Sequence, residues 1–185
     1  HYTCIIPVEM NIMNILAQIL GAGAMVSLFL IYQQKERKKM IAAKLSADIF
    51  WVAHYWLLKA PGGMIPNFVG IFRELVFINR KSKKWASLII WPVIFILISW
   101  VLGIKTFTAW YNLLPLTAST FVTVSLWIDN PRLTKLMTVP ISLAFLIYDI
   151  FVSSYIGIIN ESVSIGSIII YFIRERALKH KEMPQ

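Results

Sequence analysis

The stretch WASLIIWPVIFILISWVLGI, residues 85–104, decides the fold class of this chain. It runs for 20 residues without a charge, between Lys83 and Lys84 on one side and Lys105 on the other. A helix needs about 20 apolar residues to cross the hydrocarbon core of a bilayer. Lipid offers no hydrogen-bond partners to the backbone, so such a segment has to be helical. We therefore predict that residues 85–104 form a transmembrane helix.

The composition of the whole chain agrees with this interpretation. Of the 185 residues, 58% are hydrophobic and 15% are charged, and the mean hydropathy is +0.68. Soluble domains are about 45–50% apolar and about 25% charged, so the composition indicates a polytopic membrane protein. The single cysteine, Cys4, excludes an internal disulfide and a thiolate metal site.

Six further apolar stretches flank the first one and suggest a repeated plan. The seven expected spans are residues 13–32, 41–58, 62–78, 85–104, 109–128, 136–156 and 163–173. We predict an all-α membrane protein in which two parallel three-helix repeats are joined by a linker helix, a 3+1+3 arrangement. Its expected parts are an extracytoplasmic segment (1–12, with Met10 or Met13 as the natural start), a first bundle (13–80), the linker (84–105), a second bundle (108–176) and a cytoplasmic tail (177–185).

The basic residues predict the orientation. Fifteen of the 18 lysines and arginines fall after the first, third, fifth and seventh spans, whereas the opposite loops hold only Lys59 and Lys105, and Arg73 lies within a span. Short cytoplasmic loops carry the excess of positive charge, so the N-terminus is expected outside and the C-terminus in the cytoplasm. The net charge of +9 is then a topology signal, and nucleic-acid binding is not expected.

Polar residues inside apolar spans are costly and are therefore functional candidates. The candidates for a substrate pathway are His54, Asp149, Asn67, Arg73, Trp51, Tyr148 and Asn112. The candidates for structural or gating roles are Asp48, Glu74, Pro115 and Glu161.

Each candidate also has a structural interpretation. Asp48 can equally pair with Lys44, and Trp51 can anchor its helix at the membrane interface. Arg73 should meet a carboxylate, either Asp48 or, by a route through a neighbouring helix, Glu74.

His54 and Asp149 form the leading pair of candidates. They superpose at a shift of 95 residues, so we expect them to line one shared central site. The alternative is that they bind each other directly and only fasten the helices together.

No signature of an enzyme is present in the sequence. We find no paired carboxylates in distinct environments, no Ser-His-Asp context and no phosphate-binding loop, so catalysis, a metal site and a cofactor are not expected.

Several motifs together resemble the YgjV family of bacterial inner-membrane proteins. They are QQKERKK and LSADIFWVAHYWLLKAPGGMIPNFVGIFREL in the first half, and NLLPL and IYDIFVSSYIGIINE in the second. The family pattern falls on His54, Asn67 and Arg73, and on Pro115, Tyr148, Asp149, Glu161 and Arg174. The family is similar in plan to the PQ-loop group that includes the SWEET transporters. This resemblance implies the bacterial inner membrane, the 3+1+3 plan and a hinge at Pro115.

Two functions from different classes remain open. The first is a SWEET-like facilitator or carrier that moves a small polar metabolite by alternating access. The second is a non-transporting membrane protein, such as a sensor, assembly factor or partner-binding protein, whose buried charges only lock helices. A solvent-reachable cavity favours the first, and a dry, mutually paired cluster favours the second. The lipid bilayer is the expected partner in both, and the oligomeric state stays open.

Overall fold

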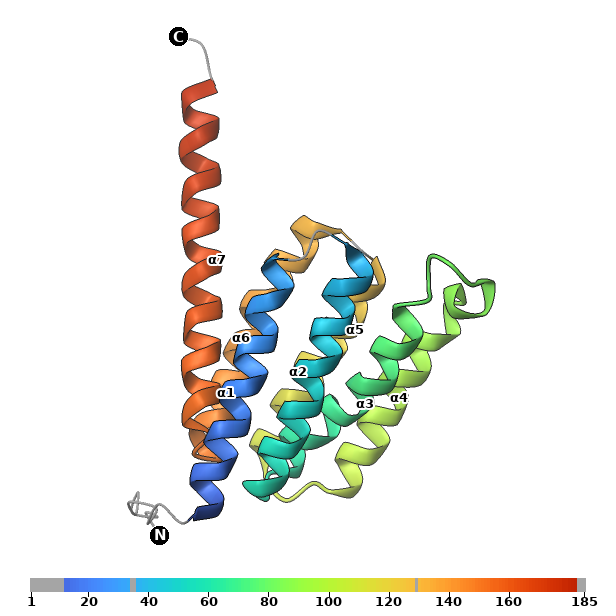
Figure 1. Ribbon diagram of the computed structural model, residues 1–185, viewed down its shortest axis with the longest axis vertical. Helices are drawn as coiled ribbons and strands as arrows, with labels where there is room; N and C mark the ends of the chain where they lie inside the picture. The colour runs from blue at the N-terminus through green and yellow to red at the C-terminus, as the bar shows by residue number, and fades with distance from the viewer. Residues whose placement is uncertain (1–11, 34–35, 129, 183–185) are drawn as a thin grey trace.

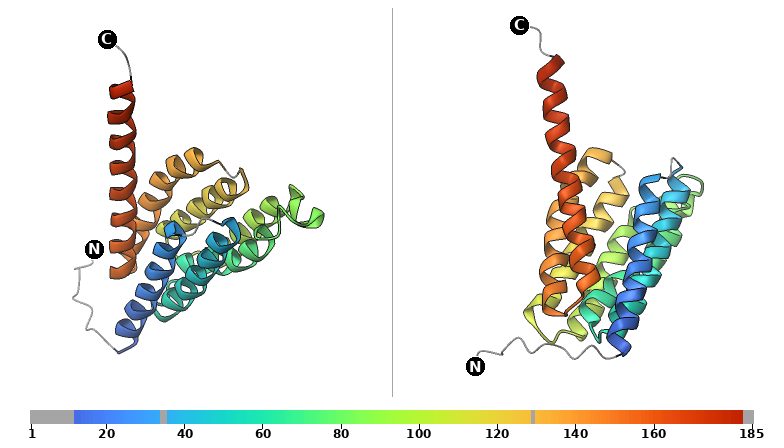
Figure 2. Two further views of the ribbon diagram at one scale, coloured as in Figure 1. Left: turned by 45° about the horizontal axis from the view of Figure 1, so that its top comes forward. Right: turned by 60° about the vertical axis from the view of Figure 1, so that its left-hand side comes forward.

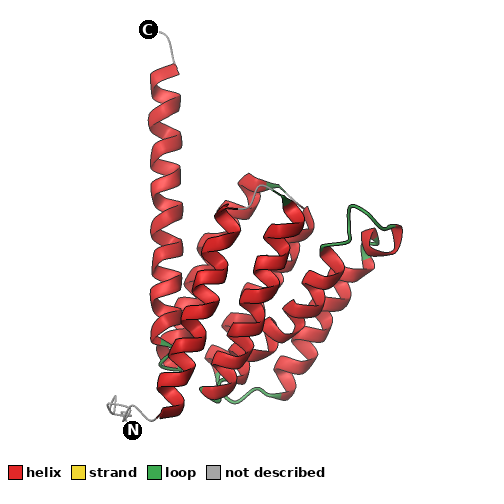
Figure 3. Ribbon diagram, in the orientation of Figure 1, coloured by secondary structure: helices red, strands yellow, loops and turns green. Residues whose placement is uncertain are grey.

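The chain folds into a bundle of helices joined by short turns (Figures 1 and 3). A computed structural model of the protein describes residues 12–33, 36–128 and 130–182, and no strand occurs within these ranges. The α-helices are α1 (Ile12–Gln33), α2 (Arg37–Leu57), α3 (Pro61–Phe77), α4 (Ile90–Lys105), α5 (Leu113–Ile128), α6 (Pro131–Phe151) and α7 (Tyr155–Glu182). Short 3-10 helices, η1 (Lys84–Ser87) and η2 (Trp110–Asn112), precede α4 and α5. The expected N-terminal segment lies outside the described residues apart from Ile12, as do the last three residues of the expected tail.

Four of the described helices are long and apolar enough to cross a membrane. The qualifying stretches are Ile12–Leu30, Trp110–Ile128 (which joins η2 to α5), Leu133–Phe151 and Tyr155–Ile173. The apolar helix Ile90–Lys105 has only 16 residues, which is about 24 Å at 1.5 Å per residue. In α2 the basic residues and Asp48 lower the apolar content, and α3 has 17 residues. The seven apolar runs thus correspond to seven helices, of which four qualify as spans by length and composition.

Six helices form a ring, and α4 lies outside it (Figure 2). Helices that follow one another in the chain pack together within α1–α2–α3 and within α5–α6–α7. Contacts between α3 and α5 and between α1 and α7 close the ring, while α4 packs against α3 and α5. The C-terminal part of α7 projects beyond the other helices (Figure 1).

The fourth, sixth and seventh helices differ from the prediction. The expected fourth span started at residue 85, but Lys84–Ser87 forms η1 and α4 begins at Ile90. The expected sixth span continued to residue 156 and the seventh started at 163, but α6 ends at Phe151 and α7 begins at Tyr155. The turn between them contains no glycine or proline. Instead, Ser153 takes the left-handed conformation that glycine usually adopts, with a φ of 56°. Because apolar residues lie on both sides of the turn, the hydropathy of the sequence shows no break there.

A second turn has the same geometry. Lys59, between α2 and α3, has a φ of 53°. The N–H of Ala60 donates to the carbonyl of Tyr55 at 2.9 Å, just as the N–H of Ser154 donates to the carbonyl of Asp149 at 2.9 Å. Both turns lie at the end of the bundle where α1 begins, here called the N-terminal end. The opposite end carries exposed lysines such as Lys38, Lys39 and Lys83, and is here called the basic end.

Candidate functional site

His54 is buried at the N-terminal end of the bundle and joins three elements. Its Nδ1 lies 2.7 Å from the carbonyl oxygen of Ala17 on α1, and its Nε2 lies 2.7 Å from the hydroxyl of Ser154 in the α6–α7 turn. A carbonyl oxygen can only accept, so Nδ1 donates to Ala17. The imidazole therefore connects α2 to α1 on one side and to the α6–α7 turn on the other.

Asp149 and Tyr148 extend this network across the bundle. The hydroxyl of Tyr55 donates to Oδ1 of Asp149 at 2.8 Å, and the N–H of Gly63 donates to the hydroxyl of Tyr148 at 2.7 Å. His54, Tyr55, Tyr148, Asp149 and Ser154 are all at most 2% exposed, and we call these five residues the central network. His54 and Asp149 thus lie in one buried network, but neither lines one of the two cavities described below, so their role in a solute pathway stays a prediction. They do not bind each other directly, because Ser154 binds the Nε2 of His54.

Two glycines make this close packing possible. A Cβ built on Gly63 would lie 2.9 Å from ring atoms of both Tyr55 and Tyr148. A Cβ on Gly157 would collide with the carboxylate of Asp149 and the hydroxyl of Ser154. Any larger side chain at either position would push the central network apart.

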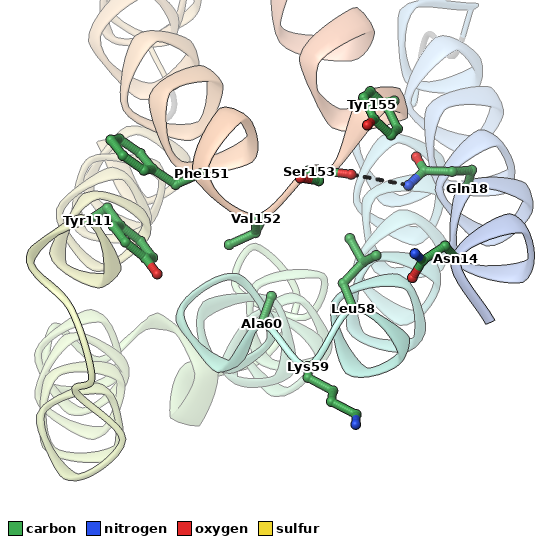
Figure 4. Close-up of a pocket in the computed structure, with 10 residues that line it drawn as sticks. All are labelled: Asn14, Gln18, Leu58, Lys59, Ala60, Tyr111, Phe151, Val152, Ser153 and Tyr155. Atoms are coloured by element: carbon green, nitrogen blue, oxygen red, sulfur yellow. Dashed lines mark hydrogen bonds between the residues drawn. The ribbon is translucent and has the colours of Figure 1, made fainter. Parts of the chain in front are cut away.

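An outer cavity of about 340 Å³ opens at the N-terminal end (Figure 4). Both left-handed turns contribute to its wall, together with Asn14 and Gln18 of α1 and the aromatic residues Tyr111 and Phe151. The amide of Gln18 fastens the α6–α7 turn, since it donates to the carbonyl of Ser153 at 3.4 Å and accepts from the N–H of Ile156 at 2.9 Å. The wall of this cavity therefore includes residues that are next to members of the central network in the sequence, such as Ser153 and Tyr155 on either side of Ser154.

An inner cavity of about 120 Å³ lies between all six helices of the ring. Its polar wall contains Lys44, Asn67, Arg73, Ser119 and Glu161, and its aromatic wall contains Trp51, Tyr55 and Phe145. Tyr55 belongs both to this wall and to the central network, so the network separates the inner cavity from the outer one.

A charged cluster of Lys44, Asp48, Arg73 and Glu74 adjoins the inner cavity. The guanidinium of Arg73 binds the carboxylate of Glu74 through two hydrogen bonds of 2.9 and 3.1 Å and donates to the hydroxyl of Thr123 at 3.0 Å. Lys44 pairs with Asp48, and the second oxygen of Asp48 lies 3.9 Å from Arg73. The predicted carboxylate partner of Arg73 is confirmed, but Glu74 binds it directly because the long side chain curls back toward its neighbour in sequence.

The remaining candidates occupy different places. Asn67 donates to the carbonyl of Gly63 at 2.7 Å, and Glu161 accepts from Asn160 at 2.8 Å. Glu161 lies inside α7, whereas the expected spans placed it between two helices. Asn112 is buried in η2 and donates to Thr108 at 2.9 Å, outside the walls of both cavities. Pro115 is the third residue of α5, where a proline requires no kink, so the expected hinge inside the helix is not present there.

Four residues of the site were absent from the predicted set. Tyr55 and Ser154 complete the central network, and Ser119 and Thr123 hold Arg73. Serine, threonine and tyrosine are all frequent in apolar helices, so only their spatial neighbours mark these four. Among the described residues, no group of three His, Cys, Asp or Glu side chains is arranged to hold a metal ion.

Comparison with known proteins adds one finding to this geometry. Residues 15–179 match the family Imp-YgjV, which is described as a bacterial inner membrane protein. A comparison with curated proteins gives no match, and neither does a comparison with solved structures. The match extends from the first turn of α1 to the last turns of α7, and it confirms the resemblance to the YgjV family; the similarity to the PQ-loop group stays a prediction. The chain belongs to the Imp-YgjV family of bacterial inner membrane proteins.

Proposed function

We propose that the protein is a carrier for a small polar solute that alternates access between two three-helix halves, α1–α3 and α5–α7. The observation that carries this proposal is the inner cavity, to which all six helices of the ring contribute. Charged and amide groups in an apolar bundle are costly, and such groups often mark a binding site or a transport pathway. Binding sites of transporters built from internal repeats lie between the repeats, as this cavity does.

A register of 94 residues between the halves supports the repeat. Under this shift the two left-handed turns coincide, and their backbone hydrogen bonds correspond one by one. Under the same shift, residues of the first half coincide with residues of the second: Gln18 with Asn112, Leu28 with Val122, Trp51 with Phe145, Tyr55 with Asp149, Gly63 with Gly157 and Asn67 with Glu161. Three of these pairs line the inner cavity. This register replaces the 95-residue shift, so the counterpart of Asp149 is Tyr55, and the counterpart of His54 is Tyr148.

The central network then corresponds to a closed gate at the N-terminal end. It lies between the two cavities, and its bonds from Tyr55 to Asp149 and from Tyr148 to Gly63 cross from one half to the other. Breaking these contacts would join the cavities, and a matching closure at the basic end would complete the cycle.

The size of the inner cavity limits the solute. Its volume of about 120 Å³ is well below the range of about 300–1,000 Å³ for pockets that hold drug-sized ligands. A solute with few non-hydrogen atoms fits this state, and its polar groups would face Asn67 and Glu161. The aromatic rings of Trp51 and Phe145 supply the apolar walls.

A reconstitution experiment tests the carrier proposal. Purified protein in liposomes is incubated with a pool of small metabolites, and the vesicle contents are analysed by mass spectrometry. We expect at least one solute to enter, and we expect Asn67→Ala and Glu161→Gln to reduce its entry at least tenfold. Ser162→Ala is the control, because Ser162 is exposed and adjoins Glu161 in sequence. If folded wild-type protein passes no component of the pool, the proposal fails.

The charged cluster favours a second candidate function, a non-transporting membrane protein. Arg73 is 2% exposed, and its donors are bound by Glu74 and Thr123, which is the pattern of a structural lock. Under this alternative, His54→Gln and Asn67→Ala lower thermal stability in detergent and no solute moves. Under the carrier proposal, Asn67→Ala leaves stability near that of the wild type and stops entry.

A further inference from the structure

The carboxylate of Asp149 is buried without a cation. It is 1% exposed, and within the described residues no lysine or arginine lies within 4 Å of it. Its Oδ1 accepts from Tyr55, but its Oδ2 has no hydrogen-bond partner in this part of the chain. A buried carboxylate in this setting requires a positive ligand that cancels its charge.

Asp48 provides the contrast within the same bundle. It is equally buried and also has an oxygen without a hydrogen bond, but Lys44 pairs with it and Arg73 lies 3.9 Å away. Lys44 and Arg73 together balance the two carboxylates of Asp48 and Glu74, whereas no cation within the described residues lies within 4 Å of Asp149. The two aspartates therefore differ in the ligand that they need.

The hydrogen atoms of the central network can be counted. The Nδ1–H of His54 is used by the carbonyl of Ala17, so in the neutral imidazole Nε2 accepts, and the single hydroxyl hydrogen of Ser154 goes to it. Ser154 then has no hydrogen left for Asp149, although both side chains crowd the same face of Gly157. With His54 neutral, the unpartnered Oδ2 can bind Ser154 only if it carries a hydrogen itself and donates it to the hydroxyl oxygen.

The position of Asp149 is suited to the exchange of a proton with both the outer and the inner cavity. Val152 and Ser153, in the turn that follows Asp149, line the outer cavity. Tyr55, which binds Asp149, lines the inner cavity. Residues that bind the carboxyl group or follow it closely in sequence therefore line both cavities.

We infer that Asp149 is a proton-binding site and that the carrier couples solute movement to one proton. This rests on the proposed function. The carboxylate takes a proton on Oδ2 from the outer cavity and becomes a neutral acid, and it returns to the carboxylate when the proton leaves to the inner cavity. The O–H bond formed in the first step is the bond broken in the second, so one proton moves per cycle. The other titratable groups that face Asp149 are His54 and Tyr55 from α2, Tyr148 on α6 and Glu161 from α7.

Infrared spectroscopy of purified protein at neutral pH tests the proton site. A neutral carboxylic acid has a C=O stretching band that a carboxylate lacks, and the band shifts in heavy water. We expect Asp149→Asn to remove this band and Asp48→Asn to retain it. A spectrum in which Asp149→Asn leaves the band intact would overturn the site.

A second variant guards against misfolding of Asp149→Asn. Tyr55→Phe keeps the acid and removes the donor to its Oδ1, so the band should persist and move to higher frequency. A band that is unchanged in Tyr55→Phe would show that it belongs to another group and would overturn the assignment.

Coupling is measured in liposomes loaded with a pH-sensitive dye. An inward proton gradient should drive accumulation of the solute found in the metabolite screen, and Asp149→Asn should abolish this accumulation. Equal solute entry with and without the gradient would refute coupling while the carrier stands. If no solute moves, the carrier proposal fails, and the infrared band still decides whether Asp149 holds a proton.

Discussion

Gly63 occupies a position where a single methyl group would matter. The rings of Tyr55 and Tyr148 lie 2.9 Å from the place of its missing Cβ. We expect Gly63→Ala to lower stability by about 1–3 kcal/mol through overpacking, measured as a lower melting temperature in detergent. Gly166→Ala is the matched control, since no atom lies within 4 Å of that position, and it should leave stability equal or slightly higher. Equal losses in both variants would contradict this packing.

Arg73 and Glu74 should depend on each other. Removing the guanidinium leaves a buried carboxylate without its main partner, so Arg73→Ala should cost about 3–5 kcal/mol. Adding Glu74→Ala removes that carboxylate and should restore part of the loss, which thermal melts in detergent would measure. Lys39→Ala, in an exposed pair with Glu36, should have little effect. Purely additive losses at Arg73 and Glu74 would be evidence against the pair.

Residue-level reasoning from the sequence reached part of the site. It singled out His54, Arg73 and Asp149 because charged and imidazole groups are costly in an apolar helix. It did not single out Tyr55 or Ser154, because hydroxyl groups occur widely in such helices and only the fold brings these two to Asp149 and His54.

At the level of elements, the two left-handed turns share a strain that glycine would relieve. Ser153 and Lys59 adopt positive φ values, which cost about 1 kcal/mol or more for residues with a Cβ. We expect Ser153→Gly and Lys59→Gly each to raise the melting temperature, and Ser153→Val to lower it. No rise for either glycine variant would indicate that the turns are relaxed.

The same turns show where helix prediction from hydropathy fails. Helices α1 and α3 lie within one residue of their apolar runs, whereas α4 and α5 begin five and four residues after the expected starts because short 3-10 helices precede them. The α6–α7 boundary was wrong because a serine in the left-handed conformation ended α6 without a glycine or proline to mark the stop.

At the scale of the whole molecule, the orientation across the membrane is still a prediction. A reporter active in the cytoplasm should work after Gln185, and one active outside the cytoplasm should work next to Lys105. The physical reason is the clustering of lysine and arginine at the basic end of the bundle. A silent C-terminal fusion beside an active periplasmic one at the same position would reverse the assignment.

The place of α4 outside the ring has a consequence for which of its residues can vary during evolution. Neither cavity takes a residue from α4, and its contacts are with α3 and α5. Helix α4 brings the chain back to the N-terminal end of the bundle, so that α5 runs in the same direction as α1. The lipid-facing residues of α4 can therefore be exchanged for other apolar residues, whereas Gly103 is fixed by its packing, since a Cβ there would collide with the side chain of Leu116.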